Sequence, residues 1–473
     1  GQALSSVLPM ETTDVATGDK LGVSASLVDW NIGGTKTFRQ SSLSFNADYT
    51  SMGLYNSLFP DRCDWASPYR KLSGEMQYKS DISSACVLKS YVGYDLSSVG
   101  QNIDCRNLAF KEHNVYANVT LKANIGGGYS LFAGVANSSV ITDIDDALAR
   151  GDHYYNFRNE VHLKTELRKV FSLALKMSAG AEDYIRNSKL RYGGYQYHVD
   201  YNLLAAHVDA YWRIVPRLFL NVSGRAEHLG YAGNWMLMPR ATVSYVPDKT
   251  FQISAMFGRY SQAAEDEYIA KSGMSLPQST SDHAILSLQY NKKKTLVRIE
   301  PYYKKYRHLP LQADASYTAE GYGTSKGIDF FFENHSLVKN LTATVSYAFN
   351  DSERLYLDYT SLRAPEYASR HNIRLTAKYS IGKMIFGVAE SYASGRKFTS
   401  GTTPYYNSVD ANLTWLVSPK VIVYTSINNI LGRTNVFGFQ SDGLPQTASR
   451  DRFFYIGIFV SLKNNKAYDI SNF

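Results

Sequence analysis

Residues Leu341 to Asn350 read LTATVSYAFN, and residues His371 to Ser380 read HNIRLTAKYS. In both segments apolar or aromatic side chains alternate with polar or small ones. Strict alternation gives a β-strand one apolar face and one polar face. The pattern recurs along most of the chain, and no long amphipathic helical pattern interrupts it. A repeated strand with an apolar outer face and a wet inner face is the unit of a transmembrane β-barrel.

Three further segments support this interpretation. Val115 to Ala123 and Phe251 to Phe257 alternate in the same way, and Phe454 to Leu462 carries an entirely apolar face. Aromatic residues, such as Tyr211 with Trp212, gather toward the predicted strand ends. Amphipathic rings favour the level of the lipid headgroups, where barrels carry aromatic girdles. The sequence therefore predicts strands whose ends lie at the two membrane interfaces.

Composition excludes two other classes of protein. The 473 residues are 44% hydrophobic and contain no continuous apolar run of the roughly 18 residues that a transmembrane helix needs. The formal net charge is +8, but the basic residues are scattered along the chain. A nucleic-acid-binding protein usually shows a basic stripe or a recognition motif. We therefore expect neither a helical membrane protein nor a nucleic-acid partner.

Two kinds of connection alternate between the predicted strands, and most of the tight ones contain turn-forming residues. The tight connections are Ile32 to Lys36, Ser80 to Ala85, Ile125 to Gly128, Glu166 to Lys169, Pro216 with Arg217, Pro247 to Lys249, Asn291 to Lys294, Leu337 to Asn340, Ile381 to Lys383 and Ser418 to Lys420. The longer connections are Ser51 to Arg70, Ser97 to Asn107, Ser139 to Asp152, Ile185 to Tyr195, His228 to Trp235, Ala263 to Gln278, Leu309 to Glu320, Asp351 to Pro365, Ser394 to Pro404 and Gly432 to Arg450.

This alternation is typical of a bacterial outer-membrane barrel, with short turns on the periplasmic side and longer extracellular loops. Spanning strands need about 9 to 11 residues each, so the chain has room for about 22 of them. The predicted fold is thus an all-β, transmembrane antiparallel barrel of about 22 strands. An even number of strands places both ends of the barrel on the periplasmic side.

The three cysteines lack the spacing of a metal site. Cys63 and Cys105 fall in neighbouring predicted outer loops, where a disulfide would fit, and Cys86 lies beside a predicted inner turn. Three unpaired thiols are equally consistent with the sequence.

The sequence contains no HExxH, Walker A or paired CxxC motif. We therefore expect no enzymatic activity and no cofactor. Asp143, Asp145 and Asp146 offer carboxylates to a calcium ion, but the EF-hand spacing is missing and a solvated loop is favoured. The acidic run from Glu265 to Glu267 is interpreted in the same way, so no metal site is predicted.

Aromatic and arginine side chains at the predicted outer strand ends are candidate ligand contacts, because such residues are common anchors of recognition surfaces. Packing in the aromatic girdle is the alternative for most of them. The candidates are Trp65, Tyr69, Tyr231, Trp235, Arg259 and Tyr260. The basic side chains expected to line the lumen are Lys122, Arg298, Arg374 and Lys378.

Four segments resemble parts of the TonB-dependent outer-membrane transporters. Gly1 to Val15, GQALSSVLPMETTDV, resembles the last strand of the plug domain of that family. Glu320 to Phe330, EGYGTSKGIDF, is similar to a recurrent barrel strand. Ile427 to Phe437 and Arg452 to Leu462 resemble the last two strands. The overall character of the sequence and the polar tail from Lys463 to Phe473 resemble family members from the Bacteroidetes.

This resemblance implies a 22-stranded barrel in the bacterial outer membrane that imports a scarce ligand with energy from an inner-membrane TonB complex. The expected organisation is the end of a plug domain and lead-in at 1–20, the barrel at 21–463 and a periplasmic tail at 464–473. The plug and the TonB contact are expected in a part outside this chain, unless the plug is truly absent. Some relatives bind haem through loop histidines, which makes His153 and His308 candidates, although exposed or lumen-facing polar roles are favoured.

The expected surroundings are outer-membrane lipid and lipopolysaccharide, with surface lipoproteins or other outer-membrane subunits as further partners. A second hypothesis is that the barrel has lost transport and serves as a subunit of a larger outer-membrane assembly. The predicted outer loops are compact, and loops usually carry function, which keeps this hypothesis open. A membrane-embedded hydrolase is disfavoured, since no nucleophile with a paired base is recognisable.

Overall fold

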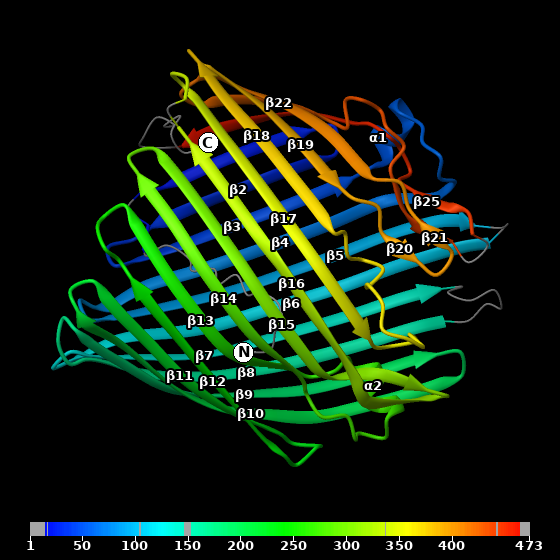
Figure 1. The fold of residues 1–473 in the computed structure, drawn as a ribbon. Helices are drawn as coiled ribbons and strands as arrows, with labels where there is room; N and C mark the ends of the chain where they lie inside the picture. Colours follow the sequence, from blue (N-terminus) through cyan, green and yellow to red (C-terminus); the bar gives the residue numbers. More distant parts are fainter. Residues whose placement is uncertain are drawn as a thin grey trace.

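The structure is a computed structural model that describes residues 15–16, 18–103, 106–145, 153–335, 337–440 and 443–463. Its main sheet has 22 strands in antiparallel order. The first strand, β1 (Lys20–Ser26), pairs with β2 (Asp29–Thr37) and also with the last strand, β26 (Phe453–Lys463). The sheet therefore closes on itself, as Figure 1 shows. The predicted 22-stranded antiparallel barrel is confirmed.

The remaining barrel strands follow one another around the wall. They are β3 (Ser41–Ser51), β4 (Trp65–Ser83), β5 (Cys86–Ile103), β6 (Arg106–Gly126), β7 (Tyr129–Asp145), β8 (His153–Val170), β9 (Leu175–Tyr192), β10 (Tyr195–Val215), β11 (Leu218–Leu229), β12 (Trp235–Tyr245), β13 (Phe251–Gln262), β14 (Ser279–Lys292), β15 (Thr295–Ala313), β16 (Ser316–Asn334), β17 (Leu341–Leu355), β18 (His371–Ile381), β19 (Met384–Ala393), β22 (Tyr406–Ser418) and β23 (Val421–Asn428).

Short elements lie in the connections. They are α1 (Gly53–Leu58), α2 (Asp266–Lys271) and two small hairpins, β20 (Lys397–Phe398) with β21 (Gly401–Thr402) and β24 (Val436–Phe439) with β25 (Pro445–Thr447). Neither helix is long or apolar enough to cross a membrane, and the described residues contain no other. Figure 1 shows α1, α2 and the hairpins at one end of the barrel, which we assign as extracellular, and tight turns at the other.

Alternation along each strand separates two faces of the wall. On β10, Leu204 and Val208 are 42% and 51% exposed, whereas Leu203 and Ala205 are buried. Exposed apolar side chains in regular alternation mark the face toward lipid, and the intervening residues face the lumen. Cross-strand partners share a face, so the continuous register between neighbouring strands extends this assignment around the wall.

Six predicted outer loops are wrong over part of their length, because barrel strands continue into them by five residues or more. They are Ser51–Arg70, Ser97–Asn107, Ser139–Asp152, Ile185–Tyr195, Leu309–Glu320 and Asp351–Pro365. β9 and β10, for example, pair without a register shift up to Tyr192 and Tyr195, and only Gly193 and Gly194 connect them. Both glycines have positive φ, 56° and 81°, which a tight hairpin turn needs. Above the membrane a strand needs no apolar outer face, so polar sequence there does not mark a loop.

Two predicted inner turns are also wrong. Ile32 to Lys36 lies inside β2, and the turn follows it at 38–40. A Cβ added to Gly34 would lie 2.9 Å from the carbonyl oxygen of Lys20 on β1, so this glycine allows close approach of strands rather than a turn. Glu166 to Lys169 likewise lies inside β8, and the connection to β9 is 171–174. Charged residues continue the strand there because they lie at the periplasmic rim.

Asp19 fastens the seam where the barrel closes. Its carboxylate accepts hydrogen bonds from Lys36 Nζ at 2.8 Å and from Lys463 Nζ at 2.9 Å, and the Thr37 amide donates to it at 2.8 Å. One side chain thus connects the ends of β2 and β26, the two neighbours of β1. The hydrogen bond from Lys36, with those from Thr37 and Lys463, holds the pKa of Asp19 well below its usual range.

Replacing Asp19 by asparagine is expected to weaken this seam in a pH-dependent way. Because the pKa is lower in the folded than in the unfolded protein, the carboxylate stabilises the fold fully above its ordinary pKa of about 3.9, and this contribution declines as the pH falls further. Urea unfolding of both proteins should give a difference that is constant from about pH 7 to pH 5 and shrinks below about pH 4. A difference that grows on acidification would contradict this role.

Candidate functional site

The connection between β13 and β14, residues 263–278, packs against the barrel on its extracellular side, and we call it the α2 loop. Ile269 and Leu276 of this loop are fully buried against Val199 of β10. The ring of Tyr268 lies 4.5 Å from that of Tyr317 on β16. The α2 loop therefore bridges the outer ends of β10 and β16, which are not neighbours in the wall.

Polar contacts fix the α2 loop to the barrel. Tyr231, in the connection between β11 and β12, donates its hydroxyl proton to the carbonyl oxygen of Leu276 at 2.9 Å. Arg186 of β9 pairs with Glu160 of β8 and with Asp266 of the loop, the latter at 3.3 Å. The acidic run at 265–267 is therefore partly neutralised by cations of the chain, since Glu267 also pairs with Lys271 at 2.6 Å.

A buried polar cluster lies beneath this loop, on the lumen side of the wall. Arg225 of β11 places Nη1 2.8 Å from Glu182 Oε2 of β9 and Nε 2.7 Å from Glu227 Oε1. Ser261, near the end of β13, and Gln278, the last residue of the loop, donate to Glu227 Oε2 at 2.7 and 2.8 Å. We call these five residues the polar cluster. It ties both ends of the α2 loop to two barrel strands.

The other extracellular connections form a second interlocked group. Arg450, before β26, reaches Asp61 in the β3–β4 connection at 2.7 Å, and Arg62 pairs with Asp451. Asn435 and Asn407 exchange hydrogen bonds between the β23–β26 connection and the start of β22. These contacts join segments that are far apart in sequence and hold this side of the mouth in one arrangement.

Asp61 shows the electrostatic character of this second group. Burial raises the pKa of its carboxyl, but hydrogen bonds from Arg450, the Cys63 amide and the Trp65 indole outweigh that effect and leave the pKa below its usual value. A carboxylate that stays ionised while enclosed keeps Arg450 in place. These contacts therefore stabilise the packing of the extracellular connections against each other.

The seven residues predicted as ligand contacts do not form one site. Trp65 begins β4, where its Nε1 donates to Asp61 at 2.9 Å, and Tyr69 lies four residues further along the same strand. Trp235 begins β12 on the outer face, 65% exposed, with its ring 5.1 Å from that of His228. The structure thus places these three either among the interlocked extracellular connections or near the outer aromatic girdle.

The other four lie on the side of the α2 loop. Tyr231 contacts the loop directly, and Tyr260 of β13 packs on the lumen side between Arg240 and His283, with ring contacts of 4.5 and 4.6 Å. Arg259 faces outward and pairs with Asp282 of β14 at 2.7 Å. His308 is exposed near the outer end of β15, and its carbonyl accepts a hydrogen bond from Ser279. A ligand-binding role for all seven stays a prediction.

Sequence reasoning missed Arg186 and the polar cluster. Charged residues at every second position of a lumen-facing strand carry no local signal, and only strand register brings β8, β9 and β11 together. Among the cysteines, Cys86 begins β5 beside the inner turn as predicted, and Cys63 lies in the β3–β4 connection. Cys105 lies outside the described residues, so the proposed disulfide stays a prediction.

This chain matches a known sequence family and the folds of solved structures. The family model "TonB dependent receptor-like, beta-barrel" matches residues 24–430. The siderophore receptor PirA from Acinetobacter baumannii superposes with a TM-score of 0.79 at 8% identity, covering 95% of this chain and 81% of that one. The ferric-catecholate import receptor Fiu from K12 E. coli gives 0.78 at 11%, covering 95% and 83%. The copper transporter OprC gives 0.77 at 11%, covering 95% and 81%. No curated protein matches the chain.

Proposed function

The chain belongs to the TonB-dependent receptor-like β-barrel family and is an outer-membrane protein, and on that premise we propose that it imports a scarce ligand across the outer membrane. Its family is one of transporters and receptors rather than of enzymes. The ligand enters from the extracellular mouth, and transport proceeds by differential binding and gating, with no bond made or broken.

The α2 loop is the observation that supports this proposal best. A barrel of this strand number has a wide lumen, and the loop crosses its extracellular side between β10 and β16. Aromatic and charged side chains converge beside it, namely Tyr201, Tyr231 and Arg186, with Tyr201 and Tyr231 edge to face at 5.2 Å. Rigid aromatic rings beside a cation are common anchors for a ligand.

We propose that residues 1–20 end a plug domain, that 21–463 form the barrel and that 464–473 are a periplasmic tail. A plug would close the lumen and pass the TonB signal to it. Lipopolysaccharide would surround the extracellular rim, and surface lipoproteins are candidate partners. The likeness to Bacteroidetes members stays a prediction.

Energised uptake is the test of this function. The relatives named above make ferric catecholate and Cu²⁺ the first probes. Cells that carry the protein should accumulate a labelled probe, and dissipating the proton gradient across the inner membrane should abolish uptake. Arg186→Ala, which frees Asp266 of the α2 loop, should alter the uptake rate. Arg298→Ala, on the lumen face near the periplasmic end of β15 and far from this loop, should not. Copurification with fixed protein partners and no energy-dependent uptake of any ligand would instead favour the transport-inactive assembly subunit.

A further inference from the structure

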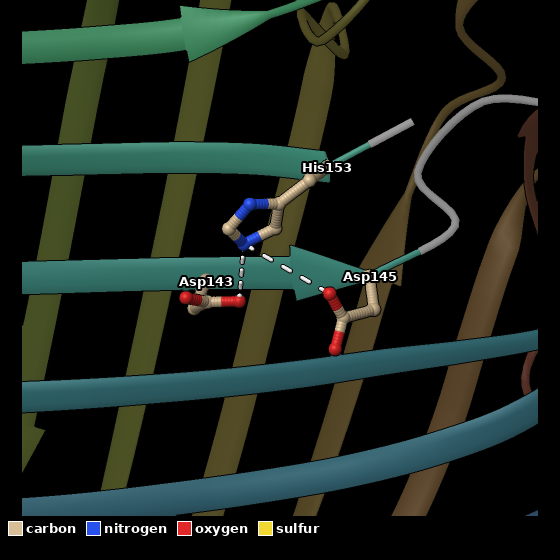
Figure 2. Close-up of side chains that lie close together, drawn as sticks. All are labelled: Asp143, Asp145 and His153. Carbon is tan, nitrogen blue, oxygen red and sulfur yellow. Dashed lines mark hydrogen bonds and ion pairs between the residues drawn. The ribbon is translucent and has the colours of Figure 1, made fainter. Parts of the chain in front are cut away.

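One group of metal-ligating side chains lies apart from the extracellular mouth just described. Asp143 and Asp145 stand at the end of β7, and His153 is the first residue of β8. In the register of the two strands His153 is directly opposite Asp145, and Tyr155 is opposite Asp143. Figure 2 shows the two carboxylates and the imidazole ring turned toward one another. Asp146, which the sequence grouped with them, lies outside the described residues.

Three donor atoms of two chemical kinds converge in this group. His153 Nε2 is 2.7 Å from Asp143 Oδ1 and 3.9 Å from Asp145 Oδ1, and one donor atom of each residue lies within 4.8 Å of the other two. A tetrahedral Zn²⁺ with bonds of about 2.1 Å holds its nitrogen and oxygen ligands about 3.4 Å apart. The two His153 distances lie on either side of that value, so small rotations of exposed side chains would complete the geometry.

The group lies on the outside of the barrel. It shares a face with Val135 and Leu163, whose exposed apolar side chains mark the lipid side. Asp143 is fourteen residues beyond Tyr129, the inner end of β7, which is about 46 Å along the strand and about 35 Å along the membrane normal for a tilt of about 40°. The apolar band of a barrel is about 25 Å tall. The group therefore lies above the hydrocarbon, facing outward.

The chain offers a comparison that separates this group from an ordinary ion pair. His198 and Asp200, at the outer end of β10, form an ion pair with a single carboxylate at 2.9 Å, and Asn187 also hydrogen-bonds to both. At His153 a second carboxylate approaches the same nitrogen, and two carboxylates held so close repel each other. Lys111 is the register partner of Asp143 on β6. A bound cation would relieve the repulsion more fully than one imidazole can.

We propose that Asp143, Asp145 and His153 bind a divalent transition-metal ion, with Zn²⁺ as the reference. Imidazole with carboxylate suits Zn²⁺ and its neighbours in the series, whereas Mg²⁺ and Ca²⁺ prefer sites made wholly of oxygen. Three protein ligands leave the remaining positions to water. The site is distinct from the proposed uptake route, because it faces outward rather than toward the lumen.

Calorimetric titration of the protein with Zn²⁺ alone, in detergent and a buffer without chelators, tests this site. We expect saturable binding at one ion per chain, weakened at least about tenfold by His153→Ala. Asp145→Asn should weaken binding as well and supplies a second variant if the first folds poorly. The matched control is His198→Ala, which removes the His–Asp pair with a single carboxylate and should leave binding unchanged.

Three results would overturn the proposal. They are a titration without saturable binding, an equal loss of affinity in His198→Ala and His153→Ala, and tighter binding of Ca²⁺ than of Zn²⁺. Retained β-sheet circular dichroism in each variant shows that a loss of binding reflects lost ligands rather than lost fold.

Discussion

Replacing Arg225 by alanine is expected to lower the free energy of unfolding by about 3–5 kcal/mol. The guanidinium is 8% exposed and pairs with Glu182 and Glu227, which are even less exposed. Removing it leaves two enclosed carboxylates without their shared cation. Breaking a buried ion pair from one side costs more than the pair itself contributes, because the remaining charge loses its compensation without regaining water. Lys164 Nζ stays 3.1 Å from Glu182 Oε1, so the loss falls mainly on Glu227.

Denaturant unfolding of the protein in lipid vesicles measures this effect. The matched control is Arg298→Ala, which removes another lumen-facing arginine that is 45% exposed and lies 3.2 Å from Glu300. Exposed ion pairs contribute about 0–1 kcal/mol, so this control should change little. Equal effects of the two substitutions would show that water enters the polar cluster freely and that it does not hold the α2 loop.

Replacing Val345 by arginine is expected to destabilise the barrel by about 2–4 kcal/mol. Val345 is opposite Leu375 in the register of β17 and β18, on the exposed apolar face. It is four residues from the periplasmic end of β17, about 10 Å along the membrane normal and thus near the middle of an apolar band of about 25 Å. A charged side chain at that depth must leave water or distort the bilayer.

Thr344, the residue before Val345, provides a control substitution on the opposite face of β17. Thr344 points into the lumen opposite Glu333 of β16, so Thr344→Arg adds a cation to a wet surface beside a carboxylate. We expect a change within about 1 kcal/mol. Folding into lipid vesicles, followed by denaturant unfolding, compares the two substitutions. A tolerated Val345→Arg with a damaging Thr344→Arg would invert the assignment of the two faces.

Sequence alone predicts the barrel because the membrane imposes a simple rule on every spanning strand. The alternation in Leu341–Asn350 and His371–Ser380 lies within β17 and β18, which begin at the same residues and extend five residues and one residue further. This alternation is required only where a strand face contacts lipid. Beyond it, residues such as Arg186 to Tyr192 continue the antiparallel ladder above the lipid, where no apolar outer face is needed, so their polar sequence resembles a loop although they form a strand.

The candidate site is less predictable for a related reason. Tyr231 could be found because an aromatic residue at an outer strand end is a visible signal. Glu182, Arg225 and Glu227 could not, because their contact depends on the register of β9, β10 and β11 and on the path of the α2 loop. Loop packing of this kind is set by contacts between distant parts of the chain, and one sequence holds no periodic pattern that reports it.

Purification of the native protein in mild detergent, followed by mass spectrometry of everything that remains bound, tests the importer proposal most directly. The proposal predicts peptides of a plug domain, either from a longer form of this chain or from an associated polypeptide, together with a small ligand at the extracellular mouth. Protein partners in fixed stoichiometry, with neither a plug nor a ligand, would contradict it and make the barrel a subunit of an outer-membrane assembly.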